Sequence, residues 1–151
     1  MPTPTVTIRV RVPFVDVDSS GRIHFTALFR YMEVAEHELM RAIGLPYATA
    51  LRDTAFPRVH LSADFRAAAT YDMLLDVEAR VERVGTTSWT LVFTTRRAPE
   101  DDGVPGAPPG ALIAEGHMTI VAMDPATERP VPLPDSLRRA LGGEGGVTHG
   151  A

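Results

Sequence analysis

Two kinds of hydrophobic spacing divide the chain, and each predicts a different element. Stretches with apolar residues at every second position predict half-buried strands. They span residues 6–14, 59–65, 75–81 and 87–93, and a fifth, strand-like run spans 111–123. After the first strand, apolar residues recur at helical spacing and predict one long amphipathic helix over residues 27–43. Gly85 separates two of the strands, so we expect these two to form a hairpin.

The predicted helix has clear boundary signals. Thr26 is a suitable N-cap, and Gly44 followed by Pro46 is typical of a C-terminal stop. One face of the helix is apolar, which predicts packing on a sheet. Strands grouped after a single helix favour an antiparallel sheet. We therefore expect an α+β fold, in which a curved antiparallel sheet of about five strands wraps around one long central helix. Such a sheet leaves an exposed edge strand, which favours a homodimer or homotetramer.

The composition is typical of one soluble globular domain. The chain has 151 residues, of which 44% are hydrophobic and 23% are charged. We expect a single domain over residues 1–141 and a disordered, glycine-rich tail over residues 142–151. Residues 98–110 contain four prolines and three glycines, so they form a loop without regular structure.

Charge and cysteine content narrow the classes of function. The net charge is -4 and the basic residues are dispersed, which argues against a nucleic-acid or anionic-membrane partner. No cysteine is present, so disulfides and thiolate catalysis are excluded. The first residues lack the pattern of a signal peptide and no apolar run has spanning length, so we expect a cytoplasmic protein. No residues have metal-ligand spacing, and we expect no metal.

The candidate chemistry lies between the first strand and the helix. Asp18 occupies a polar turn shortly before a helix N-terminus, where free N–H groups and the helix dipole favour negative charge. From the residues alone, Asp18 is either a catalytic carboxylate or a turn-forming residue. His24 either contacts substrate or water beside Asp18, or satisfies a backbone carbonyl. Thr26 is better explained as a cap than as a ligand, and Asp16 as a structural residue.

This stretch resembles a known family. Asp16-Val17-Asp18-Ser19-Ser20-Gly21-Arg22-Ile23, with Glu33 twelve residues after the glycine, is similar to the hotdog-fold acyl-CoA thioesterases of the 4-hydroxybenzoyl-CoA thioesterase type. The family signature is Asp-x-Asp-x-x-Gly, followed by an apolar residue and the central helix. The similarity extends over residues 5–140. It implies a hotdog fold, hydrolysis of an acyl-CoA thioester, and no cofactor, because coenzyme A is part of the substrate.

The resemblance also implies roles for individual residues. Asp18 matches the catalytic carboxylate of the family, and Phe25 matches the residue whose backbone N–H polarises the thioester carbonyl. The carboxylate can act as nucleophile or as general base, and both alternatives stay open. His24 and Thr26 are candidates for substrate contact. Phe25, Ala27 and Leu28 stand where members of the family commonly have other residues, several of them polar. The resemblance therefore does not indicate whether the acyl group is aromatic or aliphatic.

Other charged residues and other functions remain as alternatives. We expect Glu33 to be a structural glutamate hydrogen-bonded at the sheet, and Glu36 to lie on a solvated face. Candidates for the coenzyme A phosphates are Arg58, Arg66, Arg83, Arg96 and Arg97. The main alternative function is hydrolysis of acyl chains bound to an acyl carrier protein. A further alternative is a non-catalytic hotdog module that binds an acyl ligand.

Overall fold

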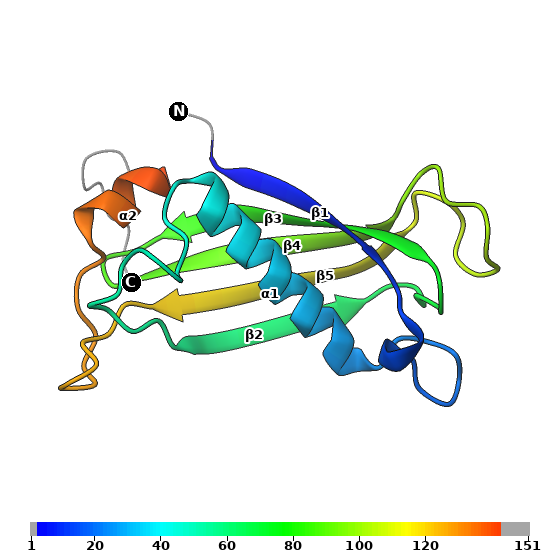
Figure 1. Cartoon of the computed structure of the whole chain (residues 1–151), viewed down its shortest axis with the longest axis horizontal. Coiled ribbons are helices and arrows are strands. Elements are labelled where there is room, and N and C mark those ends of the chain that lie inside the picture. Colours follow the sequence, from blue (N-terminus) through cyan, green and yellow to red (C-terminus); the bar gives the residue numbers. More distant parts are fainter. Residues whose placement is uncertain (1–2, 143–151) are drawn as a thin grey trace.

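A five-stranded antiparallel sheet with one long helix across its face forms the fold (Figure 1). This computed structural model describes residues 3–142. The elements are β1 (Thr5–Arg11), α1 (Phe25–Ala42), β2 (Arg58–Phe65), β3 (Leu74–Val84), β4 (Ser88–Arg97), β5 (Leu112–Val121) and α2 (Asp135–Ala140). The strand order is β1-β3-β4-β5-β2, so β1 and β2 are the two edges. The expected α+β architecture is confirmed, whereas the predicted tail lies outside the described residues apart from Gly142.

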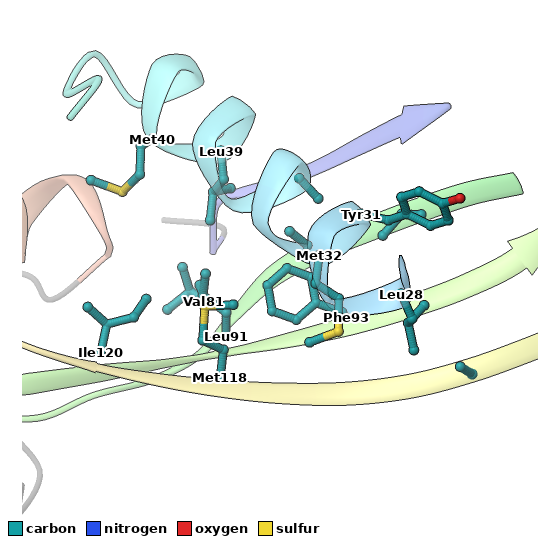
Figure 2. Close-up of a cluster of buried hydrophobic side chains, with 14 of the residues drawn as sticks. Leu28, Tyr31, Met32, Leu39, Met40, Val81, Leu91, Phe93, Met118 and Ile120 are labelled. Atoms are coloured by element: carbon teal, nitrogen blue, oxygen red, sulfur yellow. The ribbon is translucent and has the colours of Figure 1, made fainter. Parts of the chain in front are cut away.

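The apolar side of α1 is buried against the middle of the sheet. Figure 2 shows the helix side chains Leu28, Tyr31, Met32, Leu39 and Met40 with the strand side chains Val81, Leu91, Phe93, Met118 and Ile120. Removing this surface from water is the main force that holds the helix on the sheet. The helix approaches β5 closely at Gly116, where a Cβ atom would lie 2.9 Å from Met32 Cε. The N-terminal end of α1, where the candidate chemistry lies, is thereby fixed relative to the strands.

The helix begins two residues earlier than the sequence predicted. Its first residue is Phe25, and the N-cap is His24 rather than Thr26. His24 has an extended backbone, and its Nδ1 accepts a hydrogen bond from Thr26 N at 3.3 Å. An imidazole nitrogen thus accepts the N-cap hydrogen bond that a serine or aspartate oxygen usually accepts. At the other end Gly44, with a φ of +84°, terminates the helix as expected.

In two segments, apolar residues that the alternating pattern predicted to be buried are exposed. Phe14 continues the pattern of the first strand, but β1 ends at Arg11 and Phe14 lies in a short 3₁₀ helix with 74% of its surface exposed. Pro13 has no N–H to donate to the strand ladder, which explains why the strand stops before it. In β2, Val59 and Leu61 are also exposed, because β2 is an edge strand.

The predictions for the helix glutamates were wrong. Glu36 is fully buried rather than solvated, and its carboxylate accepts hydrogen bonds from Arg58 Nη2 at 2.6 Å and from Tyr47 Oη at 2.7 Å. Burial alone lowers the pKa of Arg58, but the Glu36 carboxylate raises it above its ordinary value. Glu33, which we expected at the sheet, is exposed and forms no hydrogen bond within residues 3–142. The structural glutamate is therefore Glu36.

Candidate active site

A tight hairpin leads from the first strand into α1. Val17 and Ile23 face each other across it as an antiparallel bridge. At its tip Asp18 N–H donates to Arg22 O at 2.8 Å, and Gly21 N–H donates to Asp18 O at 3.0 Å. Gly21 has a φ of +82°, a conformation that residues with a Cβ rarely adopt. The hairpin therefore holds Asp18 at a fixed place just before the helix.

Asp16, the first aspartate of the motif, is a buried structural residue, as the sequence suggested. One carboxylate oxygen accepts a hydrogen bond from Tyr31 Oη at 2.6 Å, and the other is paired with the guanidinium of Arg30. Burial raises the pKa of Asp16, but the hydrogen bonds from Tyr31 and Arg30 together hold it below its ordinary value. Both oxygens of Asp16 are thus occupied by donors from the first turns of α1.

Asp18, the second aspartate, has an exposed carboxylate. Its Oδ1 accepts hydrogen bonds from Ser20 Oγ at 2.6 Å and from Ser20 N at 2.8 Å. These donors, the hydroxyl first, lower the pKa of Asp18 from its ordinary value, so the group is ionised at neutral pH. Within residues 3–142, the two hydrogen bonds with a measured distance both go to Oδ1, and the Arg22 N–H also faces the carboxylate and helps to lower its pKa. One oxygen is held in place, and the other is open to solvent.

The start of α1 presents an unused backbone donor. Phe25 is the first helical residue, and its N–H donates to no acceptor in the described part of the chain. His24 N–H donates to Asp16 O at 2.8 Å, and His24 Nδ1 lies 2.7 Å from Thr26 Oγ1. The first N–H groups of a helix have no intrahelical partner and lie at the positive end of its dipole. The Phe25 N–H can therefore stabilise a negatively charged oxygen.

The structure brings some predicted site residues together and separates others. Asp18, His24, Phe25 and Thr26 all belong to the hairpin and the first turn of α1. Glu33 lies further along the helix, away from this group.

Among the arginines proposed for coenzyme A phosphates, Arg58 and Arg97 are committed to internal partners. Arg58 pairs with Glu36, and Arg97 is 2% exposed and pairs with Asp101. Sequence reasoning passed over Arg22, whose backbone lies across the hairpin from Asp18. Its place directly after the glycine of the motif was the available signal.

Two further observations concern possible partners. No three His, Cys, Asp or Glu side chains within residues 3–142 are grouped as metal ligands would be. No helix in this part of the chain is both long and apolar enough to cross a membrane.

Comparison with known proteins identifies the family. A family model described as the thioesterase superfamily matches residues 20–103, more than half of the chain. The chain therefore belongs to the thioesterase superfamily. The acyl-CoA thioester hydrolase YbgC of Escherichia coli is 25% identical over 129 residues, which cover 85% of this chain and 89% of that protein.

Solved structures agree with the hotdog fold. A 4-hydroxybenzoyl-CoA thioesterase mutant complexed with 4-hydroxybenzoyl-CoA matches with a TM-score of 0.77 and 19% identity, over 91% of this chain and 99% of that one. The dynemicin thioesterase, studied for polyene binding, matches with a TM-score of 0.77 and 25% identity, over 91% and 95% of the two chains. The predicted fold and the predicted resemblance to 4-hydroxybenzoyl-CoA thioesterases are confirmed. The protein is a thioester hydrolase with a hotdog fold.

Proposed function

We propose that this thioesterase hydrolyses acyl-CoA thioesters, with Asp18 as the catalytic carboxylate and the Phe25 N–H as the donor to the oxyanion. The observation that carries the proposal is an ionised carboxylate with one free oxygen, in the hairpin that leads directly to an unused helix N–H. The name of the E. coli relative supports coenzyme A as the thiol component. No cofactor is needed, because coenzyme A arrives with the substrate.

Two routes use these groups. In the first, Asp18 Oδ2 attacks the thioester carbon, the C–S bond breaks, the thiolate takes up a proton, and water then hydrolyses the mixed anhydride. In the second, Asp18 removes a proton from a water molecule that attacks the same carbon. Both routes place negative charge on the former carbonyl oxygen, where the Phe25 N–H binds it. Both also require Asp18 to be ionised, which a pKa below its ordinary value favours.

His24 and Thr26 are the proposed substrate contacts beside these two groups. His24 Nδ1 is occupied by Thr26, which leaves Nε2 available to the substrate or to a water molecule. The hydrogen bond between His24 Nδ1 and Thr26 Oγ1 also holds the imidazole ring next to the Phe25 N–H. Its effect is to restrict where the thioester can lie.

Thiol release from a panel of aryl- and alkyl-CoA thioesters tests the proposal. We expect Asp18→Asn to lower kcat by about a hundredfold or more, the usual size of a lost general base or nucleophile. The matched control is Asp53→Asn, at an exposed aspartate between α1 and β2, which we expect to match the wild type. Far-ultraviolet circular dichroism establishes that each variant is folded. A folded Asp18→Asn protein with wild-type turnover would refute the role of Asp18.

The two routes are distinguished by repeated-turnover hydrolysis in water enriched in heavy oxygen. Nucleophilic attack transfers label into the Asp18 carboxylate after repeated turnovers, because water can open the mixed anhydride at either carbonyl. General-base catalysis leaves the label in the released acid alone. Mass spectrometry of the peptide containing Asp18 detects this label, and its presence establishes nucleophilic attack.

A second candidate substrate is an acyl chain bound to a carrier protein. The family match describes a thioesterase without naming the thiol component of its substrate, so it is compatible with this candidate. Turnover of an acyl-phosphopantetheinyl carrier protein far above that of the matching acyl-CoA would establish it.

We also propose a homodimer or homotetramer formed through the β2 edge. Val59 and Leu61 expose apolar surface on that edge strand, and no other strand within residues 3–142 pairs with its outer side. Light scattering coupled to size-exclusion chromatography measures the assembly.

A further inference from the structure

A cavity of about 320 Å³ lies directly beside the Asp18 hairpin. It is lined by Arg22, Ile23, Phe65, Arg66 and the three alanines at 67–69. The hairpin itself forms one wall, and this wall is fastened to the opposite one by backbone pairing. Ile23 N–H donates to Ala69 O at 2.9 Å, and Arg22 forms an antiparallel bridge with Thr70. The cavity is therefore held in a fixed position relative to Asp18.

The lining of this cavity is basic and contains no carboxylate. Within residues 3–142, Arg22 forms no ion pair. Arg66 is 3.4 Å from Glu115, but both side chains are about half exposed, and such surface pairs contribute little. A second cavity, beside α1, includes Glu33 in its lining. A third, on the outer face of the sheet, includes two carboxylates. Of these three cavities, the one at the hairpin is the best suited to an anion.

The positions of the two arginines match a ligand that also reaches Asp18. Asp18 N–H donates to Arg22 O at 2.8 Å, so the backbones of these two residues lie directly opposite each other in the hairpin. Arg66 lies on the other side of the cavity, at the end of β2. A long, flexible arm that runs from Asp18 into the cavity would therefore meet a guanidinium group on each side.

The chemistry of the lining points to a phosphate on an apolar arm. Guanidinium groups bind phosphate oxygens through paired, charge-assisted hydrogen bonds. Phe65 is 47% exposed and the neighbouring alanines carry only methyl groups, so they offer apolar surface beside the charges. Phosphopantetheine combines a phosphate with an arm that bears methyl groups and ends in the thiol of the thioester.

We propose that Arg22 and Arg66 bind the phosphate of the phosphopantetheine arm while the thioester lies at Asp18. This assignment rests on the proposed thioesterase function of the hairpin. Coenzyme A and acyl carrier proteins both contain this phosphate, so the cavity serves either source of substrate. Of the five arginines considered from the sequence, the assignment selects Arg66, and it adds Arg22.

The test compares benzoyl thioesters that differ only in the thiol component: pantetheine, phosphopantetheine, coenzyme A and a phosphopantetheinyl carrier protein. For wild type, Arg22→Gln and Arg66→Gln, the measured quantity is kcat/KM for the phosphopantetheine thioester divided by that for the pantetheine thioester. We expect each substitution to lower this ratio about tenfold, mainly through KM, as the loss of a charged hydrogen bond predicts. The matched control is Arg129→Gln, at an exposed arginine outside the cavity, for which the wild-type ratio is expected.

Each pattern of results decides the assignment. A lowered ratio, with equal losses for the coenzyme A and carrier-protein substrates, supports binding of the shared phosphate. A loss for only one of these two sources supports a contact with other parts of coenzyme A or with the carrier surface, and overturns the assignment. An unchanged ratio overturns it as well, as does an equal loss on pantetheine and phosphopantetheine thioesters, which signals a general structural effect.

Binding measurements separate this inference from the proposed function. Isothermal titration of free phosphopantetheine and free pantetheine reports the phosphate contact without any hydrolysis. If Asp18→Asn keeps full turnover while the arginine substitutions weaken phosphopantetheine binding about tenfold, the phosphate site stands and the catalytic role falls. If Asp18 is essential and phosphopantetheine binds no better than pantetheine, the phosphate site is refuted alone.

Discussion

Arg97, at the end of β4, organises the proline-rich loop that follows it. The side chain is 2% exposed. Its Nε donates to Asp101 Oδ2 at 2.9 Å, Nη1 to Ala107 O at 2.7 Å and Nη2 to Val104 O at 2.8 Å. The same Asp101 oxygen accepts a hydrogen bond from Leu74 N at 2.9 Å, so the cluster also joins the loop to the start of β3. A loop that contains no regular structure is thus fixed by one buried ion pair.

Replacing this arginine by methionine is expected to destabilise the protein strongly. Arg97→Met keeps much of the buried chain but removes the donors to two carbonyl oxygens and one carboxylate. Each lost hydrogen bond costs about 1 kcal/mol net, and a buried charge left without its partner costs more. We therefore expect the free energy of unfolding to fall by about 4 kcal/mol, the usual range for a broken buried pair. That is a large share of the roughly 5–15 kcal/mol that stabilises a domain.

Urea unfolding, followed by the fluorescence of the buried Trp89, measures this loss. The matched control is Arg96→Met. Arg96 is the exposed neighbour of Arg97, and its one side-chain hydrogen bond within residues 3–142 is a long one of 3.4 Å to Gly110 O. We expect this substitution to change the free energy of unfolding by about 0.5 kcal/mol or less. The double substitution Arg97→Met with Asp101→Leu should recover part of the loss, because no unpaired carboxylate remains. A loss below about 1 kcal/mol for Arg97→Met, or an equal loss for both arginines, would refute the reasoning.

Two further substitutions follow from the same structure. Ser20→Ala removes the hydroxyl that contributes most to lowering the pKa of Asp18, so this pKa should rise towards its ordinary value of 3.8. We therefore expect the acid limb of the pH profile of kcat/KM to move to higher pH. Ser19→Ala is the control, and an acid limb that stays in place in Ser20→Ala would contradict the prediction. Glu36→Gln removes a fully buried charge from its arginine partner and is expected to cost about 3 kcal/mol in urea unfolding. Glu38→Gln, at a partly exposed site, should cost about 0.5 kcal/mol, and equal effects of the two would contradict the difference in burial.

The sequence predicted those parts of the fold that depend on local periodicity. The hairpin of β3 and β4 and the face of α1 that packs on the sheet follow from spacing alone, because strands and helices place neighbouring side chains in regular directions. The stop at Gly44 was also readable, since its positive φ is a conformation that glycine adopts readily.

Burial of charged residues could not be predicted in the same way. Glu36 lies on the same helix as exposed glutamates, and what buries it is Arg58, 22 positions away in the chain, together with Tyr47. Arg97 follows an exposed arginine in the sequence, and its partners belong to a loop whose conformation has no periodic signal. In both cases the deciding contact is made by the tertiary structure, which the local pattern does not encode.

The sequence predicted the candidate site only in part. The motif located Asp18 and the start of the helix, but the N-cap was assigned to Thr26 because threonine is a common cap and histidine is not. The structure places the cap at His24, which makes Phe25 the first helical residue and leaves its N–H free. The boundary shift of two residues therefore supports the proposed oxyanion contact at Phe25.

The spacing of the two aspartates in the motif has a physical explanation in this structure. The carboxylate of Asp16 is bound on both oxygens by Arg30 and Tyr31, so it cannot reach a thioester without breaking buried contacts. Its own backbone oxygen accepts the His24 N–H at 2.8 Å, which fixes the residue before the free N–H of Phe25. Asp16 thus anchors the helix start, whereas Asp18, two positions later, is held by one oxygen only and faces solvent. In the proposed mechanism, Asp16 therefore positions the oxyanion donor, and Asp18 remains available for the reaction.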